Sequence, residues 1–229
     1  MSQYPLWNQL NTLKEAQWVD LTHTFDPNIP RFSEFEKGEV STLFNVKDHG
    51  FYVQRWSIVT QYGTHIDAPI HFVENRRYLE ELDLKELVLP LIVLDYSKEA
   101  AQNSDFIVSR KHLEDWEQQH GRIEAGTFVA LRTDWSKRWP DIEKFENKDV
   151  DGHQHLPGWG LDALKFLIEE RGVKSIGHGE RYILGQDTFQ VELLTNLDQL
   201  PTRGAIIYAI SPKPKDAPGF PVRAFAIKP

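Results

Sequence analysis

The feature that most constrains the fold is a nearly continuous apolar run from Val88 to Tyr96, interrupted by Pro90. Such a run predicts a strand that is buried on both faces, and the proline fixes where the strand starts. Thr127 to Arg132 is a second run of this kind. Between the two runs, Ser109 is a suitable N-cap for a helix through Gln119, and Gly121 is a suitable stop. The chain must therefore cover both faces of at least part of a sheet.

Further helix and strand patterns alternate along the rest of the sequence. Gly160 to Arg171 carries leucines at helical spacing and precedes Gly172, which favours a helix that ends there. Trp135 to Gly158 combines Trp and Pro with many charges and indicates a long surface excursion, a kind of segment that often lines a site. The other predicted elements are a helix at Leu6–Gln17 and strands at Val19–His23, Phe51–Thr60, Val173–Gly177, Gly204–Ile210 and Phe220–Ile227.

Length and composition narrow the class of protein. With 229 residues, 40% of them hydrophobic, we expect residues 1–229 to form a single domain with one good core. A net charge of -8 argues against a nucleic-acid surface or an anionic membrane as partner. The absence of cysteine excludes a disulfide frame, a thiolate nucleophile and Cys-ligated zinc. No apolar run approaches the roughly 20 residues that span a bilayer, and the first residues lack signal-peptide character, so a cytoplasmic location is expected.

Chemically active side chains are concentrated in the stretch Gln61-Tyr62-Gly63-Thr64-His65-Ile66-Asp67-Ala68-Pro69-Ile70-His71-Phe72. If the preceding strand continues, Gln61, Gly63, His65 and Asp67 share one face, because side chains two apart on a strand point the same way. Gly63 leaves room for a ligand, while His65 and Asp67 offer a neutral nitrogen and an anionic oxygen to one cation. Pro69 then ends the strand, and His71 follows on a turn. A His-x-Asp pair alone is more often an ordinary hydrogen-bonded pair, so the metal-site hypothesis depends on the wider string.

This string resembles the signature His-x-Gly-Thr-His-x-Asp-x-Pro-x-His-Phe of the cyclase or kynurenine formamidase-like family of metal-dependent hydrolases. Every fixed position except the first matches. The resemblance implies that Gln61, His65 and Asp67 hold a metal ion and that His71 is the catalytic acid and base. Gln61 departs from the family, which usually has His there.

The resemblance extends to two further candidate ligands near the end of the chain. Glu192 fits the position of a family Glu that completes the metal site, and Glu180 falls where the family has a second His. A carboxylate among apolar neighbours needs a cation or hydrogen-bond donors, which supports Glu192. Glu180 can equally be a surface charge.

The family resemblance also implies substrate contacts. The loop from Asp26 to Phe35 corresponds to one that contributes an aromatic residue to the substrate pocket, and Phe32 is its counterpart, although a Phe that only pins the loop is equally compatible. His178 ends a predicted strand where the family usually carries an acidic loop of roughly twenty residues, a length at which loops are normally functional. Here Gly177-His178 runs almost directly into Gly179-Glu180. Either the loop is lost or the sequence omits a mobile segment; we favour the second, because active-site lids often disorder.

For the whole chain, the resemblance implies an α/β fold with a mixed, barrel-like β core flanked by helices, of the swivelling β/β/α type. It also implies a homodimer or a higher homo-oligomer. Exposed aromatic residues agree with such an assembly, and the chain has seven Trp.

The chemistry follows from the ligand set. A divalent ion held by His65, Asp67 and Glu192, with Gln61 as a weak fourth donor, would lower the pKa of a water molecule toward about 7. His71 would move the proton to the leaving nitrogen or oxygen. This predicts hydrolysis of an amide, a formamide, a lactam or a cyclic ester. Oxygen donors in place of two family histidines favour a single ion, either zinc or manganese.

Two other classes of function remain compatible with the sequence. A noncatalytic small-molecule-binding protein could keep the same cavity with Gln61 having disabled the metal site, and its ligand binding would then survive a His65→Ala change. A metal-dependent isomerase or oxygenase could use a His/Asp/Glu set with iron, and oxygen consumption would reveal it.

Overall fold

The computed structural model describes residues 2–177 and 180–229, without the side chain of Glu180. Its centre is a nine-stranded sheet with the order β1-β13-β11-β5-β7-β9-β10-β4-β12, and two further pairs, β2-β3 and β6-β8, lie outside this sheet. The strands are β1 (Gln17–Asp20), β2 (Glu39–Phe44), β3 (Val53–Ser57), β4 (His65–Asp67), β5 (Val88–Asp95), β6 (Ile107–Val108), β7 (Phe128–Arg132), β8 (Gly158–Trp159), β9 (Ser175–Gly177), β10 (Phe189–Glu192), β11 (Ala205–Ile210), β12 (Gly219–Pro221) and β13 (Arg223–Lys228).

Short helices connect and cover the strands. The α-helices are α1 (Pro5–Glu15), α2 (Val46–His49), α3 (Ser97–Gln102), α4 (Arg110–His120), α5 (Ile142–Glu146), α6 (Leu161–Lys165) and α7 (Glu180–Gly185). One π-helical segment, η5 (Phe166–Glu170), continues α6, and the 3-10 turns are η1 (Pro69–His71), η2 (Leu79–Glu81), η3 (Leu84–Leu87), η4 (Trp135–Arg138) and η6 (Leu197–Gln199). Within the described residues, no helix is long and apolar enough to cross a membrane.

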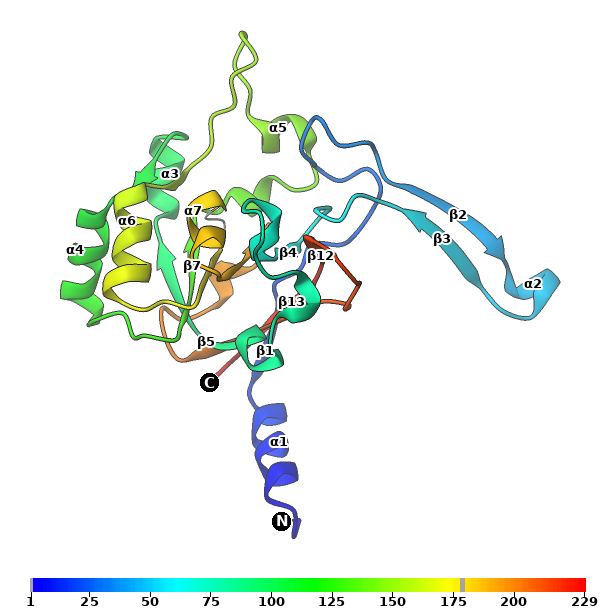
Figure 1. Ribbon diagram of the computed structural model, residues 1–229, viewed down its shortest axis with the longest axis horizontal. Helices are drawn as coiled ribbons and strands as arrows, with labels where there is room; N and C mark the ends of the chain where they lie inside the picture. Colours follow the sequence, from blue (N-terminus) through cyan, green and yellow to red (C-terminus); the bar gives the residue numbers. More distant parts are fainter. Residues whose placement is uncertain (1, 178–179) are drawn as a thin grey trace.

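The sheet separates two cores. β5, β7, β9 and β10 are mutually parallel, and α4 and α6 lie together against one face of these strands (Figure 1). On that face Ile92, Val129 and Ile176 pack with Leu113 of α4 and Leu164 of α6. The antiparallel strands curl the sheet around a second core on its other face. The expected mixed, barrel-like α/β fold is therefore confirmed.

Most predicted elements are present with shifted ends. β5 confirms the buried run around Pro90, and α4 begins after Ser109 and ends before Gly121 as expected. The prediction of one strand running through the His65 motif was wrong: β3 ends at Ser57 and β4 contains only His65–Asp67. The segment between them turns, with Gly63 at a φ of +66°. The strand predicted at Phe220–Ile227 is divided at Val222 into β12 and β13.

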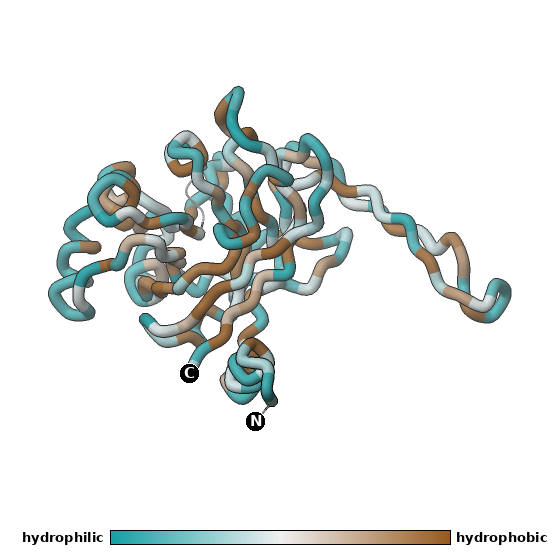
Figure 2. Tube along the Cα trace, turned by 60° about the horizontal axis from the view of Figure 1, so that its bottom comes forward, coloured by the Kyte–Doolittle hydropathy of each residue, from teal (hydrophilic) through white to brown (hydrophobic). Residues whose placement is uncertain are grey.

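Two elements project from this body. The β2-β3 hairpin extends far from the sheet, and α1 extends in another direction with no buried residue (Figure 1). Apolar positions recur along the projecting hairpin, as Figure 2 shows by hydropathy.

Candidate metal centre

A turn anchored in the core delivers His65 to the sheet. Tyr62 is fully buried, and its hydroxyl donates to the carbonyl of Pro27 over 2.7 Å. Gly63 has a left-handed φ, and an added Cβ would come within 3.1 Å of Phe25 and of Ile29, so glycine is required here. Thr64 donates its hydroxyl to the carbonyl of Leu193, which ties the start of β4 to the end of β10.

Three potential metal ligands converge where β4 pairs with β10. The antiparallel register places His65 opposite Glu192 and Asp67 opposite Gln190. Nε2 of His65 lies 3.4 Å from Oδ2 of Asp67 and 3.8 Å from Oε2 of Glu192. Two ligand atoms that bind one ion at about 2.1 Å in tetrahedral geometry lie roughly 3.4 Å apart. The spacing of these three side chains therefore fits a single ion.

The protonation of His65 also fits a metal ligand. Nδ1 lies 2.8 Å from the carbonyl of Gly63, which can only accept, so Nδ1 carries the proton and Nε2 faces the two carboxylates. Burial by itself lowers the pKa of His65, but the hydrogen bond to Asp67 and the negative charges of Asp67 and Glu192 outweigh it and raise the pKa to about 9. A site that attracts a proton this strongly is a site that attracts a cation.

Two glutamine amides hold the carboxylates in place. Gln190 is fully buried, and its Nε2 donates to Oδ2 of Asp67 over 3.0 Å and to Oε1 of Glu192 over 2.7 Å. Gln61 donates to the other oxygen of Asp67 over 3.2 Å and accepts from Thr60. In this arrangement Gln61 orients Asp67, and its role as a fourth ligand, which the family resemblance implies, stays a prediction. Gln190 was missed, although its spacing of two from Glu192 on a strand already predicts that the two share a face.

The close packing around Asp67 depends on a glycine of the neighbouring strand. Gly219 pairs with Asp67 in the register of β12 and β4. A Cβ on Gly219 would lie 2.6 Å from Nε2 of Gln61 and 2.7 Å from Oδ1 of Asp67. The site therefore leaves no room for a side chain at this position.

The other predicted site residues are not part of this group of three candidate ligands. His71 lies on η1, only four residues after Asp67, and is half-buried with its ring edge against Phe72. The backbone of Glu180 begins α7, which packs against η1 and β10, but its side chain lies outside the described residues. His178 also lies outside the described residues. Phe32 is 61% exposed and contacts Phe35.

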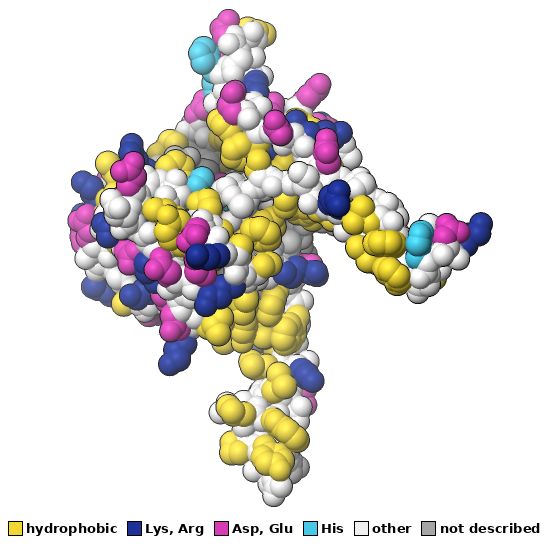
Figure 3. All heavy atoms as spheres, turned by 45° about the vertical axis from the view of Figure 1, so that its right-hand side comes forward, with side chains coloured by type: hydrophobic (Ala, Val, Ile, Leu, Met, Phe, Trp, Pro, Cys, Tyr) yellow, Lys and Arg dark blue, Asp and Glu magenta, His cyan; other side chains and the backbone are white. Residues whose placement is uncertain are grey.

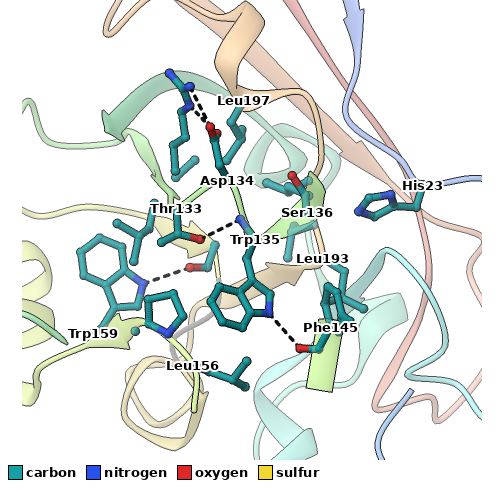
Figure 4. Close-up of a pocket in the computed structure, with 18 residues that line it drawn as sticks. His23, Thr133, Asp134, Trp135, Ser136, Phe145, Leu156, Trp159, Leu193 and Leu197 are labelled. Carbon is teal, nitrogen blue, oxygen red and sulfur yellow. Dashed lines mark hydrogen bonds and ion pairs between the residues drawn. The ribbon is translucent and has the colours of Figure 1, made fainter. Parts of the chain in front are cut away.

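An apolar cavity of about 170 Å³ opens at the C-terminal ends of β7, β9 and β10 (Figure 4). Val191 and Leu193, the two neighbours of Glu192, both line it. Its wall includes Leu131, Trp135, Phe145, Leu156, Trp159 and Leu197, and three of these come from the predicted excursion between Trp135 and Gly158. Trp135 and Trp159 each donate their indole N–H to a backbone carbonyl, of Phe145 and Gly177 respectively, so they present only ring surface.

His23 adds a polar atom to this apolar wall. Its ring stacks on Trp139 with centroids 4.1 Å apart, and its buried Nε2 has no hydrogen-bond partner in the described part of the chain. Burial lowers the pKa of His23 from 6.5 to about 4, so the ring is neutral at physiological pH. The sequence did not indicate His23 as a site residue, because no pattern in the neighbouring residues shows which part of the fold its ring contacts.

Comparisons with known proteins agree with this geometry. Residues 19–180 match the family model described as "Putative cyclase". The chain is 33% identical to an isatin hydrolase of Roseibium aggregatum, over 94% of this chain and 93% of that protein. It is 24% identical to a kynurenine formamidase of Bacillus thuringiensis subsp. konkukian, over 72% of this chain and 69% of the relative. The structure of isatin hydrolase A from Ralstonia solanacearum superposes with a TM-score of 0.91 at 30% identity, over the whole of both chains. The match to the family model, together with the full-length similarity to an isatin hydrolase, shows that this chain belongs to the cyclase family.

Proposed function

We propose that this protein is a metal-dependent hydrolase that cleaves a C–N or C–O bond in a small carbonyl compound, such as an amide, a formamide, a lactam or a cyclic ester. The observation that carries the proposal is the convergence of His65, Asp67 and Glu192 at the spacing of one ion. Similarity to an isatin hydrolase and to a kynurenine formamidase supports a hydrolytic reaction at a carbonyl carbon.

The donor set bears on the identity of the ion. One imidazole nitrogen and two carboxylates, with amide groups as their nearest neighbours, form a largely oxygen-based site that admits manganese beside zinc. When bound, such an ion supplies a Lewis acid that polarises a carbonyl and makes a water molecule more acidic. Gln190 and Gln61 hold the two carboxylates in fixed positions through donated hydrogen bonds.

His71 is the candidate for proton transfer. It follows the ligand segment on a rigid 3-10 turn that begins at Pro69, and its side chain makes no hydrogen bond among the described residues. A half-buried imidazole that is not engaged elsewhere can take a proton from water and give it to the leaving nitrogen or oxygen. His71 follows the candidate ligand Asp67 by four residues, which supports a place for its imidazole near the site.

The apolar cavity beside Glu192 supports a substrate with an aromatic portion. Its volume of about 170 Å³ is close to the 150 Å³ or so at which an apolar cavity accommodates a benzene ring. Both indole N–H groups of its wall are already bonded, so the tryptophans offer ring surface, and the polar contacts come from His23 and from Thr133, Asp134 and Ser136. We therefore favour an aryl-fused lactam or an aryl formamide as the class of substrate.

The metal content of purified variants tests the proposal. Wild type is expected to carry about one zinc or manganese ion per chain, measured by mass spectrometry, and Asp67→Asn and Glu192→Gln are each expected to lose it. Asp149→Asn is the matched control, because Asp149 belongs to a second, exposed group with Asp151 and His153. Retention of metal in both site variants, or its absence from wild type after reconstitution, would exclude this centre.

Activity provides the second part of the test. His71→Ala is expected to keep the ion but to lose about 100-fold or more in the hydrolysis of aryl lactams or formamides. His153→Ala, in an exposed loop, is expected to leave the metal content and the hydrolytic activity unchanged. Full activity of His71→Ala would remove His71 from the mechanism.

A further inference from the structure

One nitrogen in the wall of the apolar cavity lacks a hydrogen-bond partner. Among the described residues that line the cavity, only His23 has a buried side-chain nitrogen or oxygen without a hydrogen bond, at Nε2. Each apolar side chain of the described wall is buried or half-buried, whereas many exposed apolar side chains gather on the β2-β3 hairpin and on α1 (Figure 3). Nε2 therefore lies in a recess of the body, and a ligand that bonds to it recovers the free energy lost by leaving it unpaired.

Contacts with the backbone and with the ring hold His23 in place. Its backbone amide donates to Oγ1 of Thr64 over 3.1 Å, and that hydroxyl donates to the carbonyl of Leu193 over 2.8 Å. The imidazole stacks on the indole of Trp139 with the two ring planes 13° apart, and Trp139 packs edge-on against Phe145 of the cavity wall. Figure 4 shows the imidazole pointing from one side toward the other residues that line the pocket. Because Nε2 is already ordered, a ligand that bonds to it loses less conformational entropy.

The surroundings of Nε2 favour an uncharged partner. Burial lowers the pKa of His23 to about 4, so its neutral ring offers no positive charge to a carboxylate or a phosphate. The charged side chains of the wall, Arg132 and Asp134, pair with each other over 2.7 Å, so neither offers an unpaired charge to an ionic substituent. A neutral imidazole nitrogen donates in one tautomer and accepts in the other. A hydroxyl or an amino group fits both tautomers, because each group can donate and accept.

The size of the cavity limits this group to a small one. A volume of about 170 Å³, against the 150 Å³ or so that accommodates a benzene ring, leaves room for a ring with one small substituent. Two hydroxyls, of Thr133 and Ser136, also belong to the wall. Thr133 already accepts the backbone N–H of Trp135 over 3.4 Å, so Ser136 is the alternative contact for such a substituent.

We propose that His23 is a specificity-determining residue, which selects aromatic substrates that carry an uncharged hydroxyl or amino group on the ring. The selected group bonds to Nε2, while the ring lies against the apolar wall. This proposal rests on the proposed function, because it takes the aromatic ligand of the cavity to be the substrate. A histidine that only packs on Trp139 could be replaced by phenylalanine without any change in selectivity.

Binding of phenol and toluene to the full-length protein tests this inference. The two probes differ by a hydroxyl against a methyl group, and NMR titration gives both dissociation constants. In His23→Phe the ratio of the toluene constant to the phenol constant is expected to fall by about 10-fold or more, because phenol loses its partner and toluene does not. His23→Gln, which keeps a hydrogen-bonding group, is expected to retain most of the ratio.

Two control variants complete this titration. Ser136→Ala removes the alternative contact, and His153→Phe makes the same replacement in an exposed loop. Both are expected to keep the ratio of wild type. An unchanged ratio in His23→Phe, or a wild type that binds neither probe, would overturn the proposal.

A second measurement uses wild type alone, and it decides the question if His23→Phe folds poorly. The ¹⁵N resonance of Nε2 of His23 is expected to shift when phenol is added and to stay in place when toluene is added. An equal response to both probes would overturn the proposal. Neither measurement needs a metal ion or turnover. Selectivity without bound metal would therefore remove the hydrolase function and keep the role of His23, whereas bound metal without selectivity would do the reverse.

Discussion

Two histidines of this chain, His65 and His23, are both withdrawn from water, yet their surroundings move their pKa values in opposite directions. His65 faces two carboxylates, which more than offset its burial and raise the pKa to about 9. His23 meets apolar surface and the ring of Trp139, and burial lowers its pKa to about 4. The first ring is suited to a cation site, and the second is suited to an apolar pocket.

The lowered pKa of His23 predicts a pH-dependent stability. Between pH 6.5 and 4 the unfolded chain binds a proton at His23 that the folded chain does not, so the free energy of unfolding falls as the pH falls through this window. His23→Phe keeps a ring on Trp139 but cannot be protonated. We expect this variant to lose about 1–2 kcal/mol less than wild type between pH 7 and pH 4.5, because part of the ring faces solvent. Urea unfolding at the two pH values measures the difference.

His153→Phe is the control for this experiment, since His153 is exposed in a loop. It is expected to follow wild type. If His23→Phe also follows wild type, the ring of His23 is protonated in the folded chain, and the inference that this ring is neutral in the cavity wall is wrong.

At the scale of elements, the pairing of short strands constructs the site. β4 contains only three residues, and it lies between β10, which supplies Gln190 and Glu192, and β12, which supplies Gly219. Because neighbouring strands lie about 4.8 Å apart, side chains on β4 and β10 that share a face must interact. The geometry of the candidate metal ligands is thus a property of strand register.

Gly219→Ala tests the closeness of β12 to the site. The new methyl group would collide with Gln61 and Asp67, so β12 or Asp67 must move. We expect the affinity for the metal ion to fall by about 10–100-fold and the free energy of unfolding by about 1–3 kcal/mol. Isothermal titration and urea unfolding measure the two effects. Gly158→Ala, whose Cβ would approach only Ile107 at 3.9 Å, is the control and is expected to keep the affinity.

At the scale of the whole molecule, a bound ion joins distant parts of the chain. The candidate ligands come from β4 and β10, so one ion closes a long stretch of sequence that includes most of the parallel strands. An ion that binds only the folded chain stabilises it by about 2.7 kcal/mol at a concentration 100-fold above its dissociation constant. For a chain of this size we expect the melting temperature to rise by about 5–10 °C.

Calorimetry with and without zinc or manganese measures this rise. Asp67→Asn is expected to show none. An equal rise in wild type and in Asp67→Asn would place the stabilising ion elsewhere, and the exposed group of Asp149, Asp151 and His153 would then be the site to examine.

The sequence by itself determined the features that depend on neighbours along the chain. Apolar runs and caps gave β5, β7 and α4 nearly to the residue, because these signals are local. The string around His65 and Asp67 indicated two candidate ligands, and the resemblance and the apolar neighbours of Glu192 indicated the third candidate. The sequence did not show that the strand breaks before His65, since Gly63 takes a left-handed φ in a close-packed turn where an added Cβ would crowd Phe25 and Ile29.

Only the tertiary structure decided which groups meet. Strand register places Gln190 between Asp67 and Glu192, and Gly219 beside Asp67, because pairing depends on how the whole sheet closes. The cavity needs Trp135 and Phe145 from the excursion to meet Leu193 at the end of β10. Of the β2-β3 hairpin the sequence predicted only the strand at Phe51–Thr60, and only the tertiary structure shows that the hairpin projects from the body with its residues exposed. Local patterns fix elements, whereas long-range packing fixes the distances on which the chemistry depends.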